Sequence, residues 1–518
     1  MYKSIVEYFA DKSGSRCGYC SSRDSSFSHG MWGHVLTCSD YQDLIDRGWR
    51  RSGRYCYKPT MDQTCCPQYT IKCDATQFQL TKSQKKILKK FRNFIIKGDD
   101  PPMTNMTRDS SIREHGSDSE SDCSDDEDKE EGAMDVESSN QAKAEEVENQ
   151  LRLDPTKNVQ INNSSEEDSF FSCKDSTFDA TDAKVESPTH HQAHCANVNA
   201  NVKPGAGADP TKPKARKKKE LRKEKALAKL RASGKTDEEF SSKKVKNEVK
   251  TLEDLTSTEF QSDAKHKFEI RLVSAQTSDA TFNETYLDSF NVYKKYQMAV
   301  HKDSPSKCTL GQFKRFLCNA SLVHTDSSRY GAFHQQYVID GRIVAVGVVD
   351  ILPNCISSVY LYYDPDFAFL SPGTLTSLFE IAFTKKLQSE RPQLKYYYMG
   401  YYIHSCPKMR YKAKYHPSWL LCPQTYKWEP VKPSLLLLDK SKFAVLHSGD
   451  QDETKIKINE SVVLFENQAM TFELYRSLNS VDDSEMQEVQ EYAELVGSTL
   501  SKKILLYRGW LITSSCIG

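Results

Sequence analysis

The alternation of apolar and polar residues is most regular in the second half of the chain, where strand-like runs are separated by short polar turns. Two of these runs, Gln335–Ile339 and Ile343–Ile351, flank the dipeptide Asp340-Gly341. An Asp-Gly pair between β-type runs is typical of a two-residue hairpin, because a type I′ turn requires positive φ at both central positions. A third run, Val359–Tyr363, follows the hairpin.

A helix and a fourth strand come next. Ser371-Pro372 suits the N-cap and the first turn of a helix, and the apolar residues that follow recur at helical spacing. The run Lys395–Ile403 has strand character. The predicted order β-β-β-α-β gives an α+β sheet whose third strand ends at a helix N-terminus, where free N–H groups can bind an anion.

Other segments have helical or irregular patterns. Ser83–Lys97 is predicted to be a basic amphipathic helix that Gly98 ends, and Glu284–His301 is predicted to be another helix. A short helix with Phe313 and Leu317 and a last helix near Asp482–Leu500 complete the set. Residues 404–430 are predicted to be irregular, and residues 440–475 to be strand-like.

Composition divides the chain into segments. Residues 99–255 lack the apolar residues of a core and carry an acidic tract, SDSESDCSDDEDKEE, and a basic tract, KPKARKKKELRKEKALAKLR. This composition predicts a disordered linker. The expected organisation is a Cys-rich N-terminal domain at 1–98, this linker, a second folded domain at 256–508 and an unstructured tail at 509–518.

The overall composition excludes some classes of protein. The sequence has 71 basic and 71 acidic residues, and no apolar run is long enough to span a bilayer. The N-terminus lacks the apolar stretch of a signal peptide, so we expect a cytoplasmic and nuclear protein without membrane contact. In such a reducing compartment the 16 cysteines are expected to be thiols or metal ligands.

Four cysteines form a candidate metal site. Cys17 and Cys20 make a C-x2-C knuckle, and Cys65 and Cys66 follow 45 residues later. Four thiolates can hold zinc or an iron–sulfur cluster. Adjacent cysteines are unusual co-ligands because neighbouring side chains in extended backbone point apart, although a turn at Pro67 can bring them together. The alternative ligands are His29, His34, Cys38, Cys56 and Cys73.

Several long motifs resemble those of the eukaryotic arginyl-tRNA–protein transferases. In the N-terminal region they are Arg16–Cys20 (RCGYC), Tyr41–Ser52 (YQDLIDRGWRRS) and Cys65–Tyr69 (CCPQY). In the C-terminal region they are Tyr293–His301, residues 331–366 and Tyr396–Tyr411 (YYYMGYYIHSCPKMRY). The linker takes no part in the resemblance.

The resemblance implies a core similar to the Gcn5-related acetyltransferases, beside a Cys-rich metal- or cluster-binding N-terminal domain. It implies transfer of arginine from arginyl-tRNA to N-termini that begin with Asp, Glu or oxidised Cys. A ubiquitin ligase that reads N-terminal Arg would act next, in N-degron-dependent proteasomal degradation. The loop Leu370–Gly373 lacks the Gly-rich sequence that binds coenzyme A, so coenzyme A is not expected, and ATP is not expected because the aminoacyl ester is already activated.

Two other functions stay open at this point. One is a non-catalytic, metal-dependent adaptor that binds acidic N-terminal degrons, and the other is a coenzyme A-dependent acetyltransferase. Transfer of arginine from charged tRNA would distinguish an arginyltransferase from the adaptor and from the acetyltransferase. The short Leu370–Gly373 loop disfavours the acetyltransferase.

Aminoacyl transfer needs a base, oxyanion stabilisation and precise positioning, because the ester is already activated. His334 and Asp350 are the candidate bases, with Gln335 beside the first. Asp364 and Asp366 are candidates for the arginine guanidinium, with a plain turn as the alternative. The candidate acceptor and donor contacts are Ser357 and Ser358 (hydrogen bonds), Arg315 and Lys408 (acceptor carboxylate), Lys412 and Lys414 (tRNA phosphate), and Tyr398 and Tyr402 (stacking).

Two more features suggest ligands. Cys406-Pro407 resembles the Cys-Pro pairs of haem-regulated proteins, so Cys406 is a candidate haem ligand. The basic segments Lys212–Arg231 and Ser83–Lys97 are candidates for tRNA binding, and the first also resembles a nuclear import signal.

Overall fold

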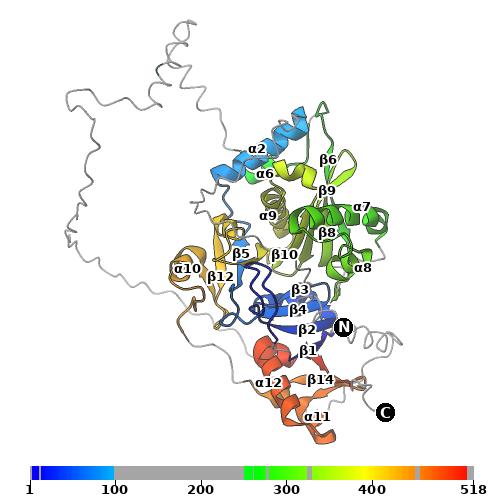
Figure 1. Cartoon of the computed structure of the whole chain (residues 1–518), viewed down its shortest axis with the longest axis vertical. Coiled ribbons are helices and arrows are strands. Elements are labelled where there is room, and N and C mark those ends of the chain that lie inside the picture. The colour runs from blue at the N-terminus through cyan, green and yellow to red at the C-terminus, as the bar shows by residue number, and fades with distance from the viewer. Residues whose placement is uncertain are drawn as a thin grey trace, which may run out of the picture. The chain divides into compact units, whose positions relative to one another are not determined.

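The computed structural model describes residues 3–10, 13–98, 224, 250–260, 262–275, 279–323, 330–449 and 456–509. Nearly all of the predicted linker, with its acidic and basic tracts, and nearly all of the predicted tail lie outside these residues. The described elements build two eight-stranded sheets and the helices that cover them (Figure 1). The prediction of a mixed α+β protein is therefore confirmed, whereas the acetyltransferase-like core stays a prediction.

One of the two sheets has the strand order β13-β12-β5-β11-β10-β9-β8-β6. Its strands are β5 (Tyr69–Asp74), β6 (Phe268–Ser274), β8 (Gly331–Ile339), β9 (Arg342–Ile351), β10 (Cys355–Tyr363), β11 (Tyr396–Tyr402), β12 (Ser418–Leu421) and β13 (Trp428–Pro430). The predicted hairpin between β8 and β9 is confirmed, since φ is 50° at Asp340 and 81° at Gly341.

Strands β10 and β11 pair in parallel over a short distance only. The pairing joins Cys355–Ser357 to Tyr396–Tyr398, and the register of β10 against β9 shifts just beyond it, between Ser358 and Tyr360. Strand β11 is also irregular, with a register shift against β5 between Tyr398 and Tyr401. We call the place where the two strands stop pairing, at Ser358 and Gly400, the β10–β11 divergence.

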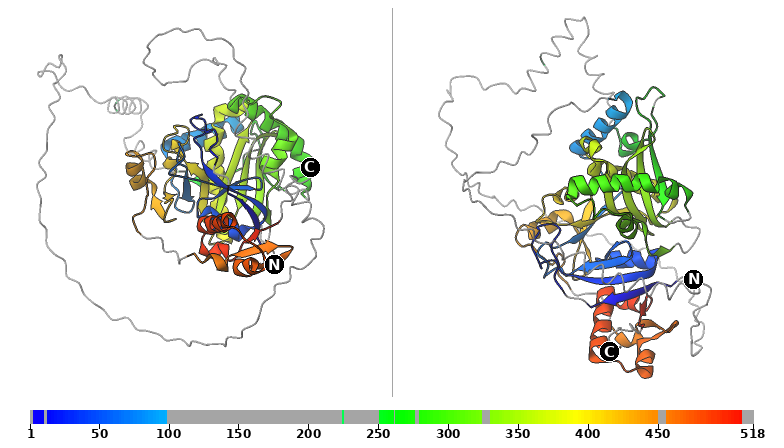
Figure 2. Two further views of the ribbon diagram at one scale, coloured as in Figure 1. Left: turned by 60° about the horizontal axis from the view of Figure 1, so that its bottom comes forward. Right: turned by 45° about the vertical axis from the view of Figure 1, so that its right-hand side comes forward.

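Helices cover both faces of this sheet. Helix α9 (Pro372–Glu390) connects β10 to β11 and packs with α2 (Lys82–Lys97) and α6 (Leu252–Thr256) on one face (Figure 1). On the other face, α7 (Ala280–Tyr296) continues as the π-helix η1 (Gln297–His301) and lies across β9 and β10 (Figure 2). The short helix α8 (Leu310–Phe313) and η2 (Lys314–Cys318) join that layer.

Helix ends follow the sequence in part. Gly98 ends α2 in the left-handed conformation, with φ of 63°, as predicted. The helix begins at Lys82, one residue before the predicted start, and Thr81 caps it by forming a capping box with Gln84. At α9, Ser371 is the N-cap residue and Pro372 lies in the first turn, as predicted, although Ser371 is left-handed and its side chain makes no capping hydrogen bond.

The second sheet combines the two ends of the chain. Its order is β15-β14-β16-β1-β2-β4-β3, and β7 also pairs with β2. The strands are β1 (Ile5–Phe9), β2 (Ser28–Thr37), β3 (Arg50–Ser52), β4 (Tyr55–Pro59), β7 (Leu322–Val323), β14 (Val462–Phe465), β15 (Gln468–Thr471) and β16 (Leu505–Tyr507). The strands are accompanied by the helices α1 (Cys38–Ile45), α11 (Phe472–Leu478), α12 (Asp483–Val496) and α13 (Ser498–Ser501). Because β1 lies between β16 and β2, and β5 lies in the other sheet, N- and C-terminal regions contribute to both sheets.

Residues 404–430 were predicted to be irregular, and this is wrong for their second half. Strands β12 and β13 occupy four and three residues there, and α10 (Val431–Leu438) follows directly. Runs this short carry too little periodicity to be detected in a sequence. The remaining short elements are the 3-10 helices η3 (Pro365–Leu370), η4 (Arg410–Lys414) and η5 (Ile458–Glu460). Across the described ranges, every helix is too short or too polar to cross a bilayer.

Candidate functional site

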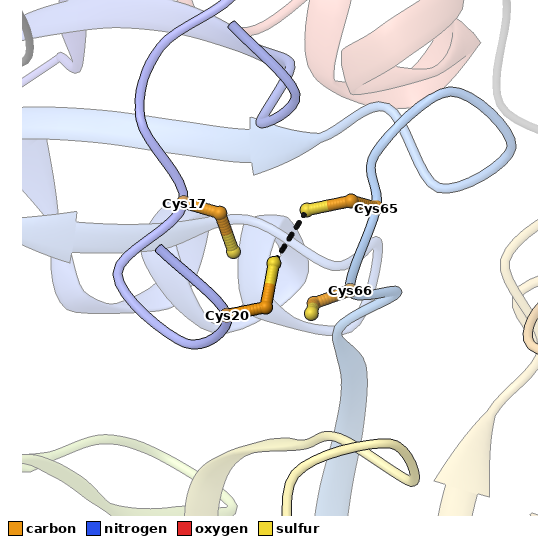
Figure 3. Close-up of side chains that lie close together, drawn as sticks. All are labelled: Cys17, Cys20, Cys65 and Cys66. Carbon is orange, nitrogen blue, oxygen red and sulfur yellow. Dashed lines mark hydrogen bonds between the residues drawn. The ribbon is translucent and has the colours of Figure 1, made fainter. Parts of the chain in front are cut away.

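The four cysteines of the candidate metal site meet in space. The Sγ atoms of Cys17, Cys20, Cys65 and Cys66 all lie within 4.8 Å of one another, and those of Cys20 and Cys65 are 3.4 Å apart. Figure 3 shows the four side chains converging from two loops. Cys17 and Cys66 are buried, while Cys20 is exposed, so one side of the group is open to solvent.

Backbone hydrogen bonds hold the two loops in this arrangement. The first loop folds back through Ser21 N–H to the Cys17 carbonyl, at 2.9 Å. The second is attached to the first because Cys65 N–H donates to the Ser25 carbonyl at 2.9 Å. The adjacent Cys65 and Cys66 therefore both reach the centre, despite the opposite directions expected of neighbours in extended backbone.

The donor set fits a metal. Four thiolates around one tetrahedral ion with bonds of about 2.3 Å have sulfur–sulfur separations of about 3.8 Å, which is compatible with the observed cluster. Hydrogen bonds from Ser22 lower the pKa of the Cys20 thiol to about 6, whereas burial raises the pKa of Cys66 to about 12. A cation at the centre would favour the thiolate form of all four groups.

The alternative ligands considered from the sequence have other partners. His29 Nδ1 lies 3.1 Å from the Tyr8 hydroxyl, and His34 Nε2 lies 3.1 Å from Glu7. The remaining three thiols are buried elsewhere: Cys38, Cys56 and Cys73. Within the described ranges, the four-cysteine set is thus the group of His, Cys, Asp and Glu side chains suited to hold a metal.

Substituting Cys20 with Ser is expected to lower bound metal from about one site equivalent per chain to near zero, because one of four thiolates is lost. Zinc and iron are both counted by elemental analysis of the purified chain. The matched control is Cys308→Ser, which removes a buried thiol outside the centre. Full metal retention in the Cys20 variant would contradict the four-ligand assignment.

The two predicted bases are both buried and have other partners. His334 is fully buried, its Nε2 lies 3.0 Å from the Leu317 carbonyl, and burial lowers its pKa to about 4. Asp350 is also fully buried and receives both Nε and Nη2 of Arg51, with the Nε bond at 2.9 Å. Burial raises the pKa of Asp350, and the Arg51 charge offsets part of that rise.

The other predicted contact residues are distributed over several places. Ser357 is buried in β10, Ser358 is half-buried at the divergence, and Gln335 accepts a hydrogen bond from Tyr337 at 3.2 Å. The Tyr398 hydroxyl donates to Asp46 at 2.6 Å, and the Tyr402 hydroxyl lies 2.8 Å from His404 Nδ1. The side chains of three predicted basic residues are exposed: Arg315, Lys408 and Lys414. Asp364 pairs with Arg342 and Lys295.

Lys412 is the predicted contact residue that reaches the β10–β11 divergence. Its Nζ donates to the carbonyls of Met399 and Tyr401, at 2.7 and 2.8 Å, and so occupies acceptors of β11 where β10 no longer pairs. A Cβ on Gly400, whose φ is 65°, would lie 4.0 Å from this Nζ. Burial lowers the pKa of Lys412 to about 7, with the Arg50 charge acting in the same direction.

Sequence reasoning missed an acidic group below the same strands. Glu380 of α9 is fully buried, accepts a hydrogen bond from the Tyr397 hydroxyl at 2.6 Å and interacts with the Ser358 hydroxyl. Burial raises its pKa to about 7. Gly347 leaves room for it, since a Cβ there would lie 2.5 Å from Glu380 Oε1. A single Glu on a helix face of Leu, Phe and Ile was the available signal.

Comparison with known proteins matches both regions of the chain. Residues 15–86 match the family model "Arginine-tRNA-protein transferase, N terminus", and residues 288–422 match "Arginine-tRNA-protein transferase, C terminus". The first match contains the four cysteines, and the second contains the β10–β11 divergence and Lys412.

Individual relatives extend the match over nearly the whole length. Arginyl-tRNA–protein transferase 1 of Drosophila melanogaster is 38% identical, with 98% of this chain and 99% of the relative covered. Arginyl-tRNA–protein transferase 2 of Arabidopsis thaliana is 35% identical over 83% of this chain and 76% of its own. An aspartate/glutamate leucyltransferase of Pseudomonas savastanoi is 35% identical over 30% of this chain and 59% of its own. On this evidence the chain belongs to the arginyl-tRNA–protein transferase family.

Proposed function

We propose that this chain transfers arginine from arginyl-tRNA to the α-amino group of proteins whose first residue is acidic. The observation that carries the proposal is the 38% identity to an arginyl-tRNA–protein transferase over 98% of the chain. The acidic acceptor is supported by the similarity to a bacterial aspartate/glutamate leucyltransferase. Oxidised Cys is included as an acceptor because its sulfinic or sulfonic group is also anionic.

The reaction joins two groups that need little activation. The acceptor amine loses one proton, its nitrogen attacks the arginyl ester carbonyl, and a tetrahedral oxyanion forms. The ester C–O bond to the terminal ribose then breaks, the new amide bond remains, and the ribose oxygen takes up a proton. Neither ATP nor coenzyme A enters this balance, so positioning and proton transfer account for most of the rate.

Lys412 is the side chain best placed to take the proton. A neutral amine has two N–H groups and one lone pair. The carbonyls of Met399 and Tyr401 can occupy both N–H groups, which leaves the lone pair to accept a proton. The pKa of about 7 places this change of state near neutral pH, where a general base works best. We therefore prefer Lys412 to His334 and Asp350 as the base.

The two earlier candidates suit supporting roles. His334 lies against the Phe282 ring, with 5.4 Å between ring centroids, in the core between β8 and α7. Asp350 links β9 to β3 through Arg51 and thereby joins the two sheets. Gln335, Ser357 and Ser358 belong to strands that place the divergence beside Glu380.

The proposal includes the cofactor and the downstream step. The four thiolates would hold zinc or an iron–sulfur cluster, which keeps the two N-terminal loops together. Cys406, the haem candidate, is buried against Cys17 and Cys66, so a bound metal and the segment after β11 share one small core. A ubiquitin ligase that recognises N-terminal Arg would then direct the product to the proteasome, in the cytoplasm or nucleus.

The test is transfer of radiolabelled arginine from charged tRNA to a peptide that begins with Asp, compared with one that begins with Ala. We expect label on the Asp peptide alone, and none when free arginine and uncharged tRNA replace the charged tRNA. Binding of the Asp peptide without transfer would reject the enzyme and favour the adaptor. Acetyl transfer from acetyl-coenzyme A to the peptide, with release of coenzyme A, would favour the acetyltransferase instead.

A further inference from the structure

Arg50, in β3, is a buried cation with unused hydrogen-bond donors. The residue is 5% exposed, and its Nη1 donates to the carbonyls of Ile45 and Trp49 at 3.3 and 2.6 Å. Its Nε and Nη2 are buried without a hydrogen-bond partner among the described residues. Buried guanidinium donors are seldom left unpaired, because each lost hydrogen bond to water costs free energy.

Arg50 also lacks a carboxylate partner of its own in the described parts of the chain. The neighbouring Arg51 has its carboxylate, Asp350. The carboxylate of Asp46 instead receives hydrogen bonds from Tyr398, at 2.6 Å, and Gln42, at 3.0 Å. No ion pair joins Arg50 to a carboxylate in the part of the chain that the structure describes. One anion would therefore complete this group of side chains.

Arg50 lies next to the candidate base. Its guanidinium carbon is 5.3 Å from the centre of the Tyr401 ring, and the carbonyl of the same Tyr401 accepts the Lys412 bond. The Arg50 charge is close enough to Lys412 to lower the pKa of its ammonium group. A molecule with an anionic group and an amine a few bonds apart could contact Arg50 with the first group and Lys412 with the second.

A cavity is lined in part by the segment just before Arg50. It measures about 250 Å³, and the residues that line it include Arg47, Gly48 and Lys58. Its lining does not include Arg50 or Lys412, but Gly48 belongs to it, and the Gly48 carbonyl accepts a hydrogen bond from the Tyr401 hydroxyl at 2.9 Å. A Cβ built on Gly48 would meet no atom within 4 Å, so the backbone is open at this point. The lining holds two cationic side chains, Arg47 and Lys58, and one carboxylate, Asp62, so its net positive charge favours an acidic peptide.

We infer that Arg50 binds the acidic side chain of the acceptor's first residue and thereby determines specificity. This inference rests on the proposed function, and it names the residue that reads the acceptor. In an N-terminal Asp or Glu the carboxylate and the α-amine are separated by only a few bonds. A carboxylate held by the planar guanidinium fork would leave the amine beside Lys412. Arg50 thus replaces Arg315 and Lys408, both exposed, as the preferred acceptor contact.

The experiment measures peptide binding to the full chain in the absence of tRNA. Fluorescently labelled peptides that begin with Asp or with its uncharged isostere Asn are titrated against wild type, Arg50→Met, Arg50→Lys and the control Arg476→Met. Arg476 is an exposed residue of α11 that donates to Asn459 at 3.3 Å. We expect Arg50→Met to weaken Asp-peptide binding by about 30-fold or more and to leave Asn-peptide binding unchanged.

Arg50→Lys keeps the charge but loses the fork, so an intermediate loss is expected. If Arg50→Met does not fold, as judged by its melting temperature, the test rests on the Asp-peptide affinity of Arg50→Lys. Equal Asp-peptide affinity in wild type and Arg50→Lys, with Arg50→Met unfolded or also unchanged, would overturn the inference. Because binding is measured without tRNA, this outcome is distinct from a failure of arginine transfer, which would reject the proposed function.

Discussion

Replacing Asp350 with Ala is expected to lower the free energy of unfolding by about 3–5 kcal/mol, because Arg51 would remain as a buried charge without its carboxylate. The two side chains are 0% and 2% exposed, so water cannot substitute for the lost partner. The measurement is urea unfolding followed by tryptophan fluorescence. Asp263→Ala, at an exposed position, is the control and should change stability by less than about 0.5 kcal/mol.

A second variant separates the ion pair from the packing around it. Arg51→Met combined with Asp350→Leu removes both charges and keeps most of the buried volume, so it should recover much of the stability lost in Asp350→Ala. The double variant should nevertheless transfer arginine poorly, because Arg51 also donates to the Gly53 carbonyl at 2.9 Å and shapes the turn after Arg50. A loss below about 1 kcal/mol in Asp350→Ala would show that this pair does not hold the sheets together.

The local elements were predictable because their signals lie in neighbouring residues. Asp340-Gly341 specifies its turn through two positive φ values, and Gly98 ends its helix in the same way. The four cysteines were proposed as a metal site from the sequence because a C-x2-C knuckle and a second pair of thiols supply the ligands of a zinc or iron–sulfur site. The turn and the helix end needed no knowledge of distant segments, whereas the four-cysteine site depends on two loops that meet in space.

The candidate transfer site depends on distant segments, and for this reason it was only partly predicted. Arg51 and Asp350 are 299 positions apart, and no periodicity in either segment indicates that they pair. Lys412 was predicted as a basic contact residue for tRNA phosphate, and that role stays a prediction. Its altered pKa, however, arises from burial and from Arg50, far away in the sequence. Glu380 acquires its environment from strands β9, β10 and β11 in the same way.

Replacing Lys412 with Met is expected to lower kcat/KM for arginine transfer by about 100-fold, because a general base of this kind contributes about that factor. Lys412→Arg should be nearly as inactive, since a guanidinium stays protonated at every accessible pH. The control is Lys386→Met, at an exposed position of α9 remote from the roles assigned above. Metal content measured in parallel shows whether the Cys centre is intact in each variant.

The pH profile distinguishes a base from a side chain that only supports β11. In wild type, kcat/KM should rise as Lys412 loses its proton around pH 7, with a second rise at about 7.7–8.0 from the acceptor amine. The variants should keep only the second rise. The free energy of unfolding should also rise with pH. Between pH 7 and about 10 the unfolded chain holds the Lys412 proton and the folded chain does not, so raising the pH favours the folded chain. This rise should be smaller in Lys412→Met. If Lys412→Met keeps the pH profile of wild type, the lysine is not the base. Its role is then purely structural, through the two hydrogen bonds that it donates to carbonyls of β11.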